Sequence, residues 1–234
     1  MVLFGAVINA LLIIIGSMIG RLFHNIPEKM KETVMSIIGL AVAVLGIQMG
    51  LTSNNFIIVI ISLVVGAMLG EWMDLDRLFQ KLGKKIESFF GPANNGKIAE
   101  GFVTASLIFV VGSMAIIGAL DSGLRNDHTV LITKGFIDGF TAIFLTSTLG
   151  MGVLLSFVPV LFYQSIIAIS ASFISTYIPT EVLDSFIQEM TATGGIMIVA
   201  IGLNIMGLVK IRVANLLPGI VVVGVIVVGL FWFR

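Results

Sequence analysis

The stretch GAVINALLIIIGSMIG, residues 5–20, contains one amide, one hydroxyl and no charged side chain. A helix of roughly 18 or more apolar residues is long enough to cross the hydrocarbon core of a bilayer. Similar runs recur along the 234 residues, which are 58% hydrophobic, only 11% charged and have a mean hydropathy of +1.13. Soluble domains carry about 25% charged residues. The sequence therefore predicts an all-α polytopic membrane protein.

The apolar runs predict about eight transmembrane helices. Their expected ranges are 3–20, 33–50, 55–70, 101–120, 130–147, 152–174, 191–208 and 215–233. This pattern divides the chain into three parts. We expect a first membrane repeat at 1–70, a cytoplasmic segment at 71–100 and a second repeat with an inserted hairpin at 101–234.

The segment 71–100 is the longest polar part of the chain. Its sequence EWMDLDRLFQKLGKKIESFF, residues 71–90, places apolar side chains at helical spacing with lysines opposite. This pattern is typical of an amphipathic helix lying on the membrane surface. The turn-rich GPANNGK that follows is expected to be a linker.

Basic residues predict the orientation, because cytoplasmic loops of membrane proteins are enriched in Lys and Arg. With the N-terminus outside, the outer segments hold only Arg125 and Arg234. The inner segments then hold Arg21, Lys29, Lys31, Arg77, Lys81, Lys84, Lys85, Lys97, Lys210 and Arg212. The sequence thus predicts a multi-pass protein with both termini outside.

Two pairs of segments resemble each other. LIIIGSM (12–18) matches IFVVGSM (108–114), and GLAVAVLGIQMGL (39–51) matches GIMIVAIGLNIMGL (195–208). In the predicted topology, matched segments run in opposite directions, as in the inverted repeats of many transporters. Spans 1–3 then match spans 4, 7 and 8, with spans 5–6 inserted. A simpler scheme matches spans 1–3 to spans 4–6.

Glycines recur four residues apart within the predicted spans. Such spacing lets helix backbones approach closely, in a bundle or at the seam of a homodimer. A rarer alternative is that some of them mark helix breaks facing a bound solute. The glycines are Gly16, Gly20, Gly46, Gly50, Gly66, Gly70, Gly135 and Gly139.

Lys134 and Asp138 are the most unusual residues of the chain, because both lie within a predicted span. Their spacing places them on one helix face. An ionisable side chain in mid-membrane usually faces protein or a water-filled cavity. The pair is either a structural salt bridge whose lysine reaches the outer interface or part of a polar pathway. Asp138 lies deeper and is the stronger candidate for ion or solute binding.

Other polar residues extend this candidate pathway. Asp121 and Glu189 lie where outer loops meet spans, and they either cap helices or form an acidic entrance. The isolated amides Asn9, Gln48 and Asn204 favour interhelical hydrogen bonds, or line a pathway. Ser17 and Ser113 mark the two Gly-Ser-Met motifs, where the matched spans are expected to cross.

Several function classes find no support in the composition. The chain has no cysteine and two histidines, so thiolate chemistry, disulfides and a His-rich metal site are not expected. Phosphate-loop, zinc-helix and nucleophile-elbow motifs are absent from the sequence. The formal net charge of zero does not suggest nucleic acid. We expect neither an enzyme nor a bound cofactor.

Four stretches together resemble a known family. They are GAVINALLIIIGSMIG, GSMAIIGALDSGL, KGFIDGFTAIFLTSTLGMGVLLSFVPVLFYQ and EMTATGGIMIVAIGLNIMGLVKIRVANLLPG. In this order they are similar to the bacterial inner-membrane family of YdfK/YqgA-like proteins, domain of unknown function 554. The resemblance covers nearly the whole chain and implies a bacterial cytoplasmic membrane location. Relatives often carry proline at the position of Ser113, so its absence predicts a more regular fourth span here.

The residues favour membrane transport of a small ion or polar solute, by a secondary transporter or a channel. Asp138 is expected to bind the solute, or to pair with Lys134 in the resting state. The competing prediction is a scaffold without transport, in which the basic surface helix at 71–90 docks a cytoplasmic partner or anionic lipid.

Overall fold

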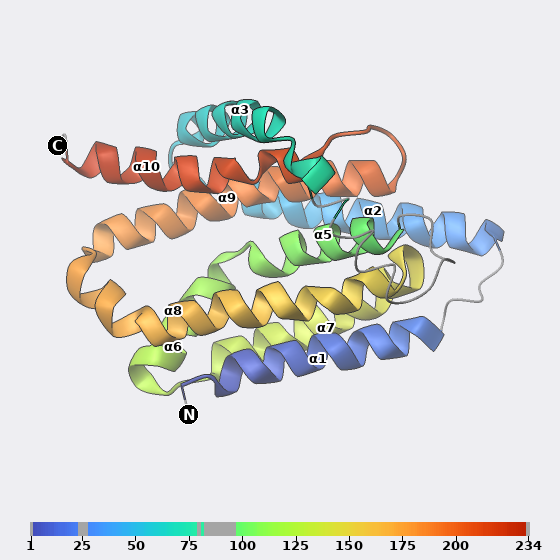
Figure 1. Cartoon of the computed structure of the whole chain (residues 1–234), viewed down its shortest axis with the longest axis horizontal. Coiled ribbons are helices and arrows are strands. Elements are labelled where there is room, and N and C mark those ends of the chain that lie inside the picture. Colours follow the sequence, from blue (N-terminus) through green and yellow to red (C-terminus); the bar gives the residue numbers. More distant parts are fainter. Residues whose placement is uncertain (1, 23–27, 79–80, 82–96, 233–234) are drawn as a thin grey trace. The chain divides into compact units, whose positions relative to one another are not determined.

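The computed structural model describes residues 2–22, 28–78, 81 and 97–232 (Figure 1). Every regular element in these ranges is helical, which confirms the all-α class. The α-helices are α1 (Phe4–Leu22), α2 (Glu28–Gly50), α3 (Phe56–Met73), α5 (Lys97–Val110), α6 (Ser113–Arg125), α7 (Thr129–Leu149), α8 (Phe157–Tyr177), α9 (Thr180–Ile205) and α10 (Pro218–Trp232). Two short 3-10 helices are η1 (Met151–Ser156) and η2 (Val213–Leu216).

The predicted surface helix at 71–90 lies largely outside the described residues. Within them, Asp74 ends α3 in a left-handed conformation with φ 49°, and residues 75–78 form one further helical turn. The linker predicted after residue 90 also lies outside the described part of the chain.

The chain forms two compact units that interleave along the sequence. The first unit contains α1, α5, α6, α7, η1 and α8. The second contains most of α2, then α3, the residues 111–113, α9, η2 and α10. Each unit therefore combines helices that are far apart in the sequence.

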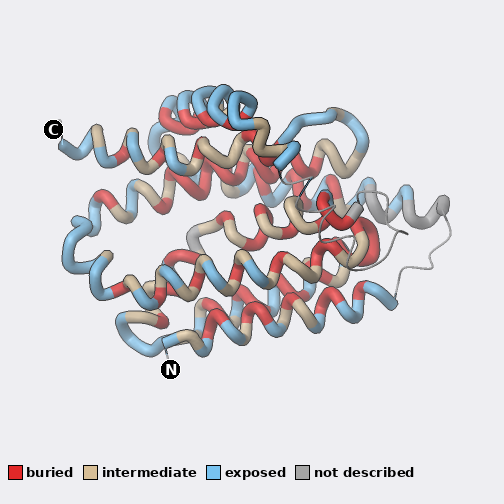
Figure 2. The backbone as a smooth tube through the Cα atoms, viewed as in Figure 1, coloured by how far each residue is buried: buried red, intermediate tan, exposed pale blue. Residues whose placement is uncertain are grey.

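Six of the described helical segments are long and apolar enough to cross a membrane. They are Phe4–Leu22, Phe56–Met73, Thr129–Leu149, Met151–Tyr177, Thr180–Ile205 and Val213–Trp232. The α5–α6 pair passes the same test as one bent segment, and Ser36–Gly50 is apolar but shorter. Large apolar side chains on these helices, such as Leu11, Phe140 and Val225, are exposed. Figure 2 shows buried and exposed positions alternating along each helix. Helices that expose this much apolar surface need lipid around them.

The core of the first unit is formed where α1, α6, α7 and α8 meet. Ala6, Ala119, Leu131 and Ala168 form a buried cluster, one residue from each helix. Three of these four side chains are alanine, which allows the helix backbones to approach closely. Such small residues are typical of helix contacts in membranes.

The seam between α1 and α7 is a close backbone contact of the first unit. A Cβ atom added to Gly16 would overlap the carbonyl of Gly139, and one added to Gly20 would overlap the carbonyl of Ile143. Gly135 packs against Asn9 in the same way. Contacts advance in the same order along both helices, so α1 and α7 run parallel.

The second unit is built around α9, which crosses α2 at two pairs of glycines. A Cβ at Gly46 would lie 2.6 Å from the carbonyl oxygen of Gly195, and one at Gly39 would lie 2.8 Å from that of Gly202. The contacts run in opposite order along the two helices, so α2 and α9 are antiparallel.

The helix α3 also packs through glycine, against the start of α10. A Cβ at Gly66 would overlap Gly219, and one at Gly70 would overlap the carbonyl of Asn215. This order makes α3 and α10 antiparallel. Gly50 makes a looser contact, in which its Cβ would meet Ile196 Cδ1 at 3.1 Å.

The sequence predicted a regular helix through the span at 101–120, and this prediction is wrong. The helix is interrupted after Val110, and the two parts, Ile98–Val110 and Met114–Arg125, are bent by 61°. Gly112 has φ +139°, a conformation that L side chains rarely adopt and that ends the helical geometry. The helix is therefore interrupted at a glycine, and Ser113 rather than a proline follows it.

The start of α9 also differs from its predicted position at Thr191. The helix begins at Thr180, directly after Pro179. Glu181 and Asp184 are exposed there, so this polar first part of the helix needs no apolar environment. The apolar run marked only the part of α9 that is buried most deeply.

The glycine seam provides a test of the fold. Replacing Gly16 by Leu should lower the thermal stability of the purified protein in detergent, because no backbone shift is available where Gly139 lies. Overpacking of this kind costs about 1–3 kcal/mol, and more where the neighbour is backbone. Gly229→Leu is the matched control, because nothing lies within 4 Å of a Cβ there. Equal melting temperatures for the two variants would contradict the seam.

Candidate functional site

The helix α7 carries a buried ion pair in its second and third turns. Lys134 Nζ donates to Asp138 Oδ2, and the two residues are only 6% and 5% exposed. The i to i+4 spacing brings both side chains to the same helix face, as the sequence predicts. Burial removes both groups from water, so each depends on the other for its charge balance.

Asn9 of α1 lies against this pair. It packs on Gly135, between Lys134 and Asp138 in sequence, and it is an electrostatic neighbour of Asp138. Its side chain is completely buried, and its amide interacts with the Asp138 carboxylate. An amide in this position offers one donor group and one acceptor beside the two charges.

Unpartnered polar side chains continue through the interior of the first unit. They include Ser17, Ser106, Thr146 and Gln164, whose buried oxygen or nitrogen atoms have no hydrogen-bond partner within the described chain. Ser62, Thr193 and Asn215 Nδ2 of the second unit are in the same condition. Polar side chains without a protein partner therefore occur in the interiors of both units.

Gln164 is the main site residue that the sequence analysis missed. It lies on the buried face of α8, one turn from Ala168, and both of its amide atoms are unpartnered. Its sequence context, PVLFYQSIIAIS, is an isolated amide in an apolar span. The criterion that selected Asn9 would also have selected Gln164.

Asp121 lies near the end of α6, where it forms an ion pair of 3.3 Å with Arg125. Ser122 Oγ is 2.9 Å from His128 Nδ1, which joins the end of α6 to the start of α7. The Asp127 carboxylate accepts a hydrogen bond from the backbone N–H of Thr129, and this bond lowers the pKa of Asp127. Polar contacts within the loop therefore organise this end of the first unit.

Glu189 belongs to the second unit and is bound to the α2–α3 loop. Its carboxylate accepts hydrogen bonds from Ser53 Oγ at 2.5 Å and from the backbone N–H groups of Asn54 and Asn55, each at 3.0 Å. Glu189 is 3% exposed. This carboxylate satisfies loop amides, which matches the capping alternative rather than an open acidic entrance.

The remaining predicted residues have different surroundings. Asn204 joins α9 to the following loop through two hydrogen bonds with the backbone of Ile211, at 2.7 and 2.9 Å. Gln48 is exposed on α2, and Ser17 is completely buried in α1. The side chain of Ser113 lies outside the described residues. The structure thus brings Lys134, Asp138 and Asn9 together.

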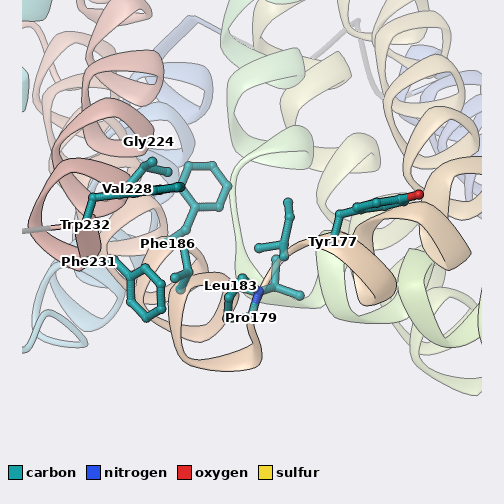
Figure 3. A pocket seen from close by; sticks show the side chains of 10 residues that line it. Tyr177, Pro179, Leu183, Phe186, Gly224, Val228, Phe231 and Trp232 are labelled. Atoms are coloured by element: carbon teal, nitrogen blue, oxygen red, sulfur yellow. The ribbon is translucent and has the colours of Figure 1, made fainter.

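Other kinds of site are less well supported. The described residues contain no group of three or more His, Cys, Asp or Glu side chains that could hold a metal ion. Figure 3 shows an apolar groove in the second unit, between the start of α9 and the end of α10. Phe186, Val228, Phe231 and Trp232 are among the residues that line it. None of the polar candidate residues lies in this groove.

Comparisons with known proteins place these features in a family. The fold and its buried charges define a helical membrane protein. The chain belongs to the family described as "Protein of unknown function (DUF554)", whose sequence profile matches residues 4–228. This confirms the family resemblance noted from the sequence motifs.

Two relatives match over most of their length. The uncharacterized membrane protein YdfK of Bacillus subtilis (strain 168) is 35% identical over 230 residues, 96% of each chain. The uncharacterized protein YqgA of Escherichia coli (strain K12) is 29% identical over 222 residues, 92% of each chain. No solved structure matches the chain significantly.

A double-mutant cycle tests the interdependence of the pair. Asp138→Asn or Lys134→Met alone should destabilise the protein by about 3–5 kcal/mol, because each leaves a buried charge without its partner. The double variant should recover much of this loss. Thermal unfolding in detergent measures the effect.

The exposed pair Asp121–Arg125 supplies the control for this cycle. Arg125 has a side chain that is 75% exposed, and removing it should cost less than about 1 kcal/mol. If single and double variants of the buried pair were equally destabilised, the two charges would not depend on each other.

Proposed function

We propose that the protein is a secondary transporter or channel for a small ion or polar solute, with its pathway in the first unit near Asp138. The observation that carries the proposal is the buried Lys134–Asp138 ion pair with the Asn9 amide beside it, within a membrane helix. In this proposal, the direct ion pair is the resting state of the site. The protein acts without covalent chemistry or a cofactor.

Energetics supports a polar pathway over a purely structural core. A polar group buried without a partner costs roughly 1–3 kcal/mol by protein mutational data. Gln164 carries two such groups, and Ser17 and Thr146 each add one. A bundle needing only stability would place apolar side chains at these positions. Water or a passing solute that bonds to these groups removes the penalty.

The broken α5–α6 helix supports the proposal independently. Non-helical backbone at membrane depth is tolerated where it is enclosed by protein or lines a water-filled cavity. Transporters use such breaks to present free backbone N–H and C=O groups to their solutes. The break at Val111–Gly112, which belongs to the second unit, supplies groups of this kind in the present chain and supports transport in general rather than the site near Asp138.

Helix directions support eight crossings. The packed helices α3 and α10 are antiparallel, so an even number of crossings must separate them. Between them lie α7, α8 and α9, each long enough to span, and the bent α5–α6 pair makes the fourth. The helices α1 and α7 are parallel, so an odd number of membrane crossings lies between them. If α3 and the bent α5–α6 pair are two of these crossings, α2 is the third.

The glycine contacts of α2 and α9 support an inverted repeat. The motif Gly39–Gly46 corresponds to Gly195–Gly202. Gly39 packs on Gly202, and Gly46 packs on Gly195, so each motif makes the same contacts with the other. Such reciprocity is characteristic of a two-fold relation. We propose that the repeat pairs spans 1–3 with spans 4, 7 and 8.

The location follows from the same proposal. We place the protein in the bacterial inner membrane, surrounded by lipid, with both termini outside. The proposal also allows two copies of the chain to form a homodimer. This orientation keeps ten of the thirteen Lys and Arg residues on the cytoplasmic side.

Permeation into liposomes tests the transport proposal directly. Proteoliposomes are mixed with hyperosmotic potassium chloride, sodium acetate, ammonium chloride, alanine or urea, and light scattering follows reswelling. Wild type should reswell at least about tenfold faster than empty liposomes for one of these solutes. In proteoliposomes that contain Asp138→Asn, most of this increase in reswelling rate over empty liposomes should be lost. Current on a solid-supported membrane then distinguishes charged from neutral transport.

Asp184→Asn is the matched control, because Asp184 is exposed on α9 and the substitution is chemically the same. Proteoliposomes that contain this variant should reswell at the wild-type rate. Rates equal to those of empty liposomes for every solute would contradict transport and favour the scaffold function. Rates unchanged in Asp138→Asn would contradict the role of Asp138.

A further inference from the structure

We propose that the solute is a small zwitterion of the α-amino acid class, which binds by replacing both partners of the ion pair. Its ammonium group would pair with Asp138 and its carboxylate with Lys134. This inference rests on the proposed transport function and adds the chemical class of the solute.

The charge balance of the first unit carries the inference. Lys134 and Asp138 are the two buried charged side chains of this unit among the described residues. Arg21, Glu100, Arg125 and Asp127 are exposed, and Asp121 is partly exposed and paired with Arg125. Among the residues whose side chains are described, one positive and one negative charge balance each other in the interior of the unit.

A neutral pair disfavours a solute that carries a single charge. A cation bound at Asp138 would leave Lys134 buried without its counter-charge, and an anion bound at Lys134 would leave Asp138 in the same condition. Breaking a buried pair in this way is strongly unfavourable. A zwitterion supplies both missing charges at once, so the charge balance is the same before and after binding.

The geometry of the pair matches an α-amino acid. Lys134 Nζ and the Asp138 carboxylate are in direct contact. The two charged groups of an α-amino acid are likewise adjacent, separated by one carbon atom. A small separation of the two side chains would therefore admit both groups of the solute together. A molecule with distant charges would not satisfy both residues.

The surroundings add uncharged hydrogen-bonding groups and restrict size. Asn9 supplies an amide beside the pair, in interaction with the Asp138 carboxylate. The α1 backbone lies tightly against Gly135 and Gly139, on the same helix as the pair. We therefore expect short side chains, as in glycine, alanine or serine.

Solutes that differ in one charge test the inference. Proteoliposomes take up labelled alanine, and unlabelled alanine, glycine, serine, propionate and ethylamine compete. Propionate and ethylamine each retain one of the two charged groups of alanine. For wild type, the three amino acids should compete at least about tenfold better than either single-charge compound, which corresponds to about 1.4 kcal/mol.

Single variants should change the selectivity in opposite directions. Asp138→Asn leaves a positive site, so alanine uptake should fall at least about tenfold while labelled propionate binds or enters better than in wild type. Lys134→Gln leaves a negative site and should favour ethylamine. Asp184→Asn and Arg125→Gln are controls that should retain wild-type selectivity. Size-exclusion profiles verify that every variant is folded.

The outcomes separate this inference from the transport proposal. The protein could instead prefer metal cations, propionate or ethylamine to alanine, glycine and serine. That result would contradict the zwitterionic solute class but would still support the transport function. Folded single variants that lose the uptake of all solutes equally, with no opposite change in selectivity, would also contradict the zwitterionic solute class. If no solute of either panel entered wild-type proteoliposomes, both proposals would fail.

Discussion

The hydrocarbon of a bilayer provides no hydrogen-bond partner, and every part of this structure depends on that constraint. The backbone meets it by forming helices in all the regular elements of the described chain. Apolar and polar side chains respond to this constraint in different ways. Large apolar residues face outward, whereas polar side chains are withdrawn into the interiors of the two units.

Close packing in such a solvent cannot rely on the hydrophobic effect between helices, since lipid is as apolar as the side chains. Glycine replaces it by allowing backbones to touch. In the first unit this occurs between Gly16 and Gly139, and in the second between Gly46 and Gly195. These contacts set the relative directions of the packed helices. Packing and topology thus have the same physical origin.

Buried charge has different uses in the two units. Glu189 of the second unit binds the α2–α3 loop through three hydrogen bonds. The first unit instead pairs Lys134 with Asp138 and places the Asn9 amide beside them. Paired charges in a low-dielectric interior are costly to separate, so a solute must replace the charges that it displaces. This requirement links the structure of the site to the class of solute.

Local features of the sequence were sufficient to predict the helical membrane class and the ion pair. Apolar runs are continuous in the chain, and residues four apart lie on one face of any helix. Contacts between distant segments were not accessible in this way. Glu189 meets Ser53 across 136 positions, and the unpartnered state of Gln164 depends on the helices around it. The bend at Gly112 likewise required a backbone angle that glycine permits but does not impose. Periodicity along one chain determines helices and their faces, whereas three-dimensional packing determines which faces meet and which polar groups remain unpartnered.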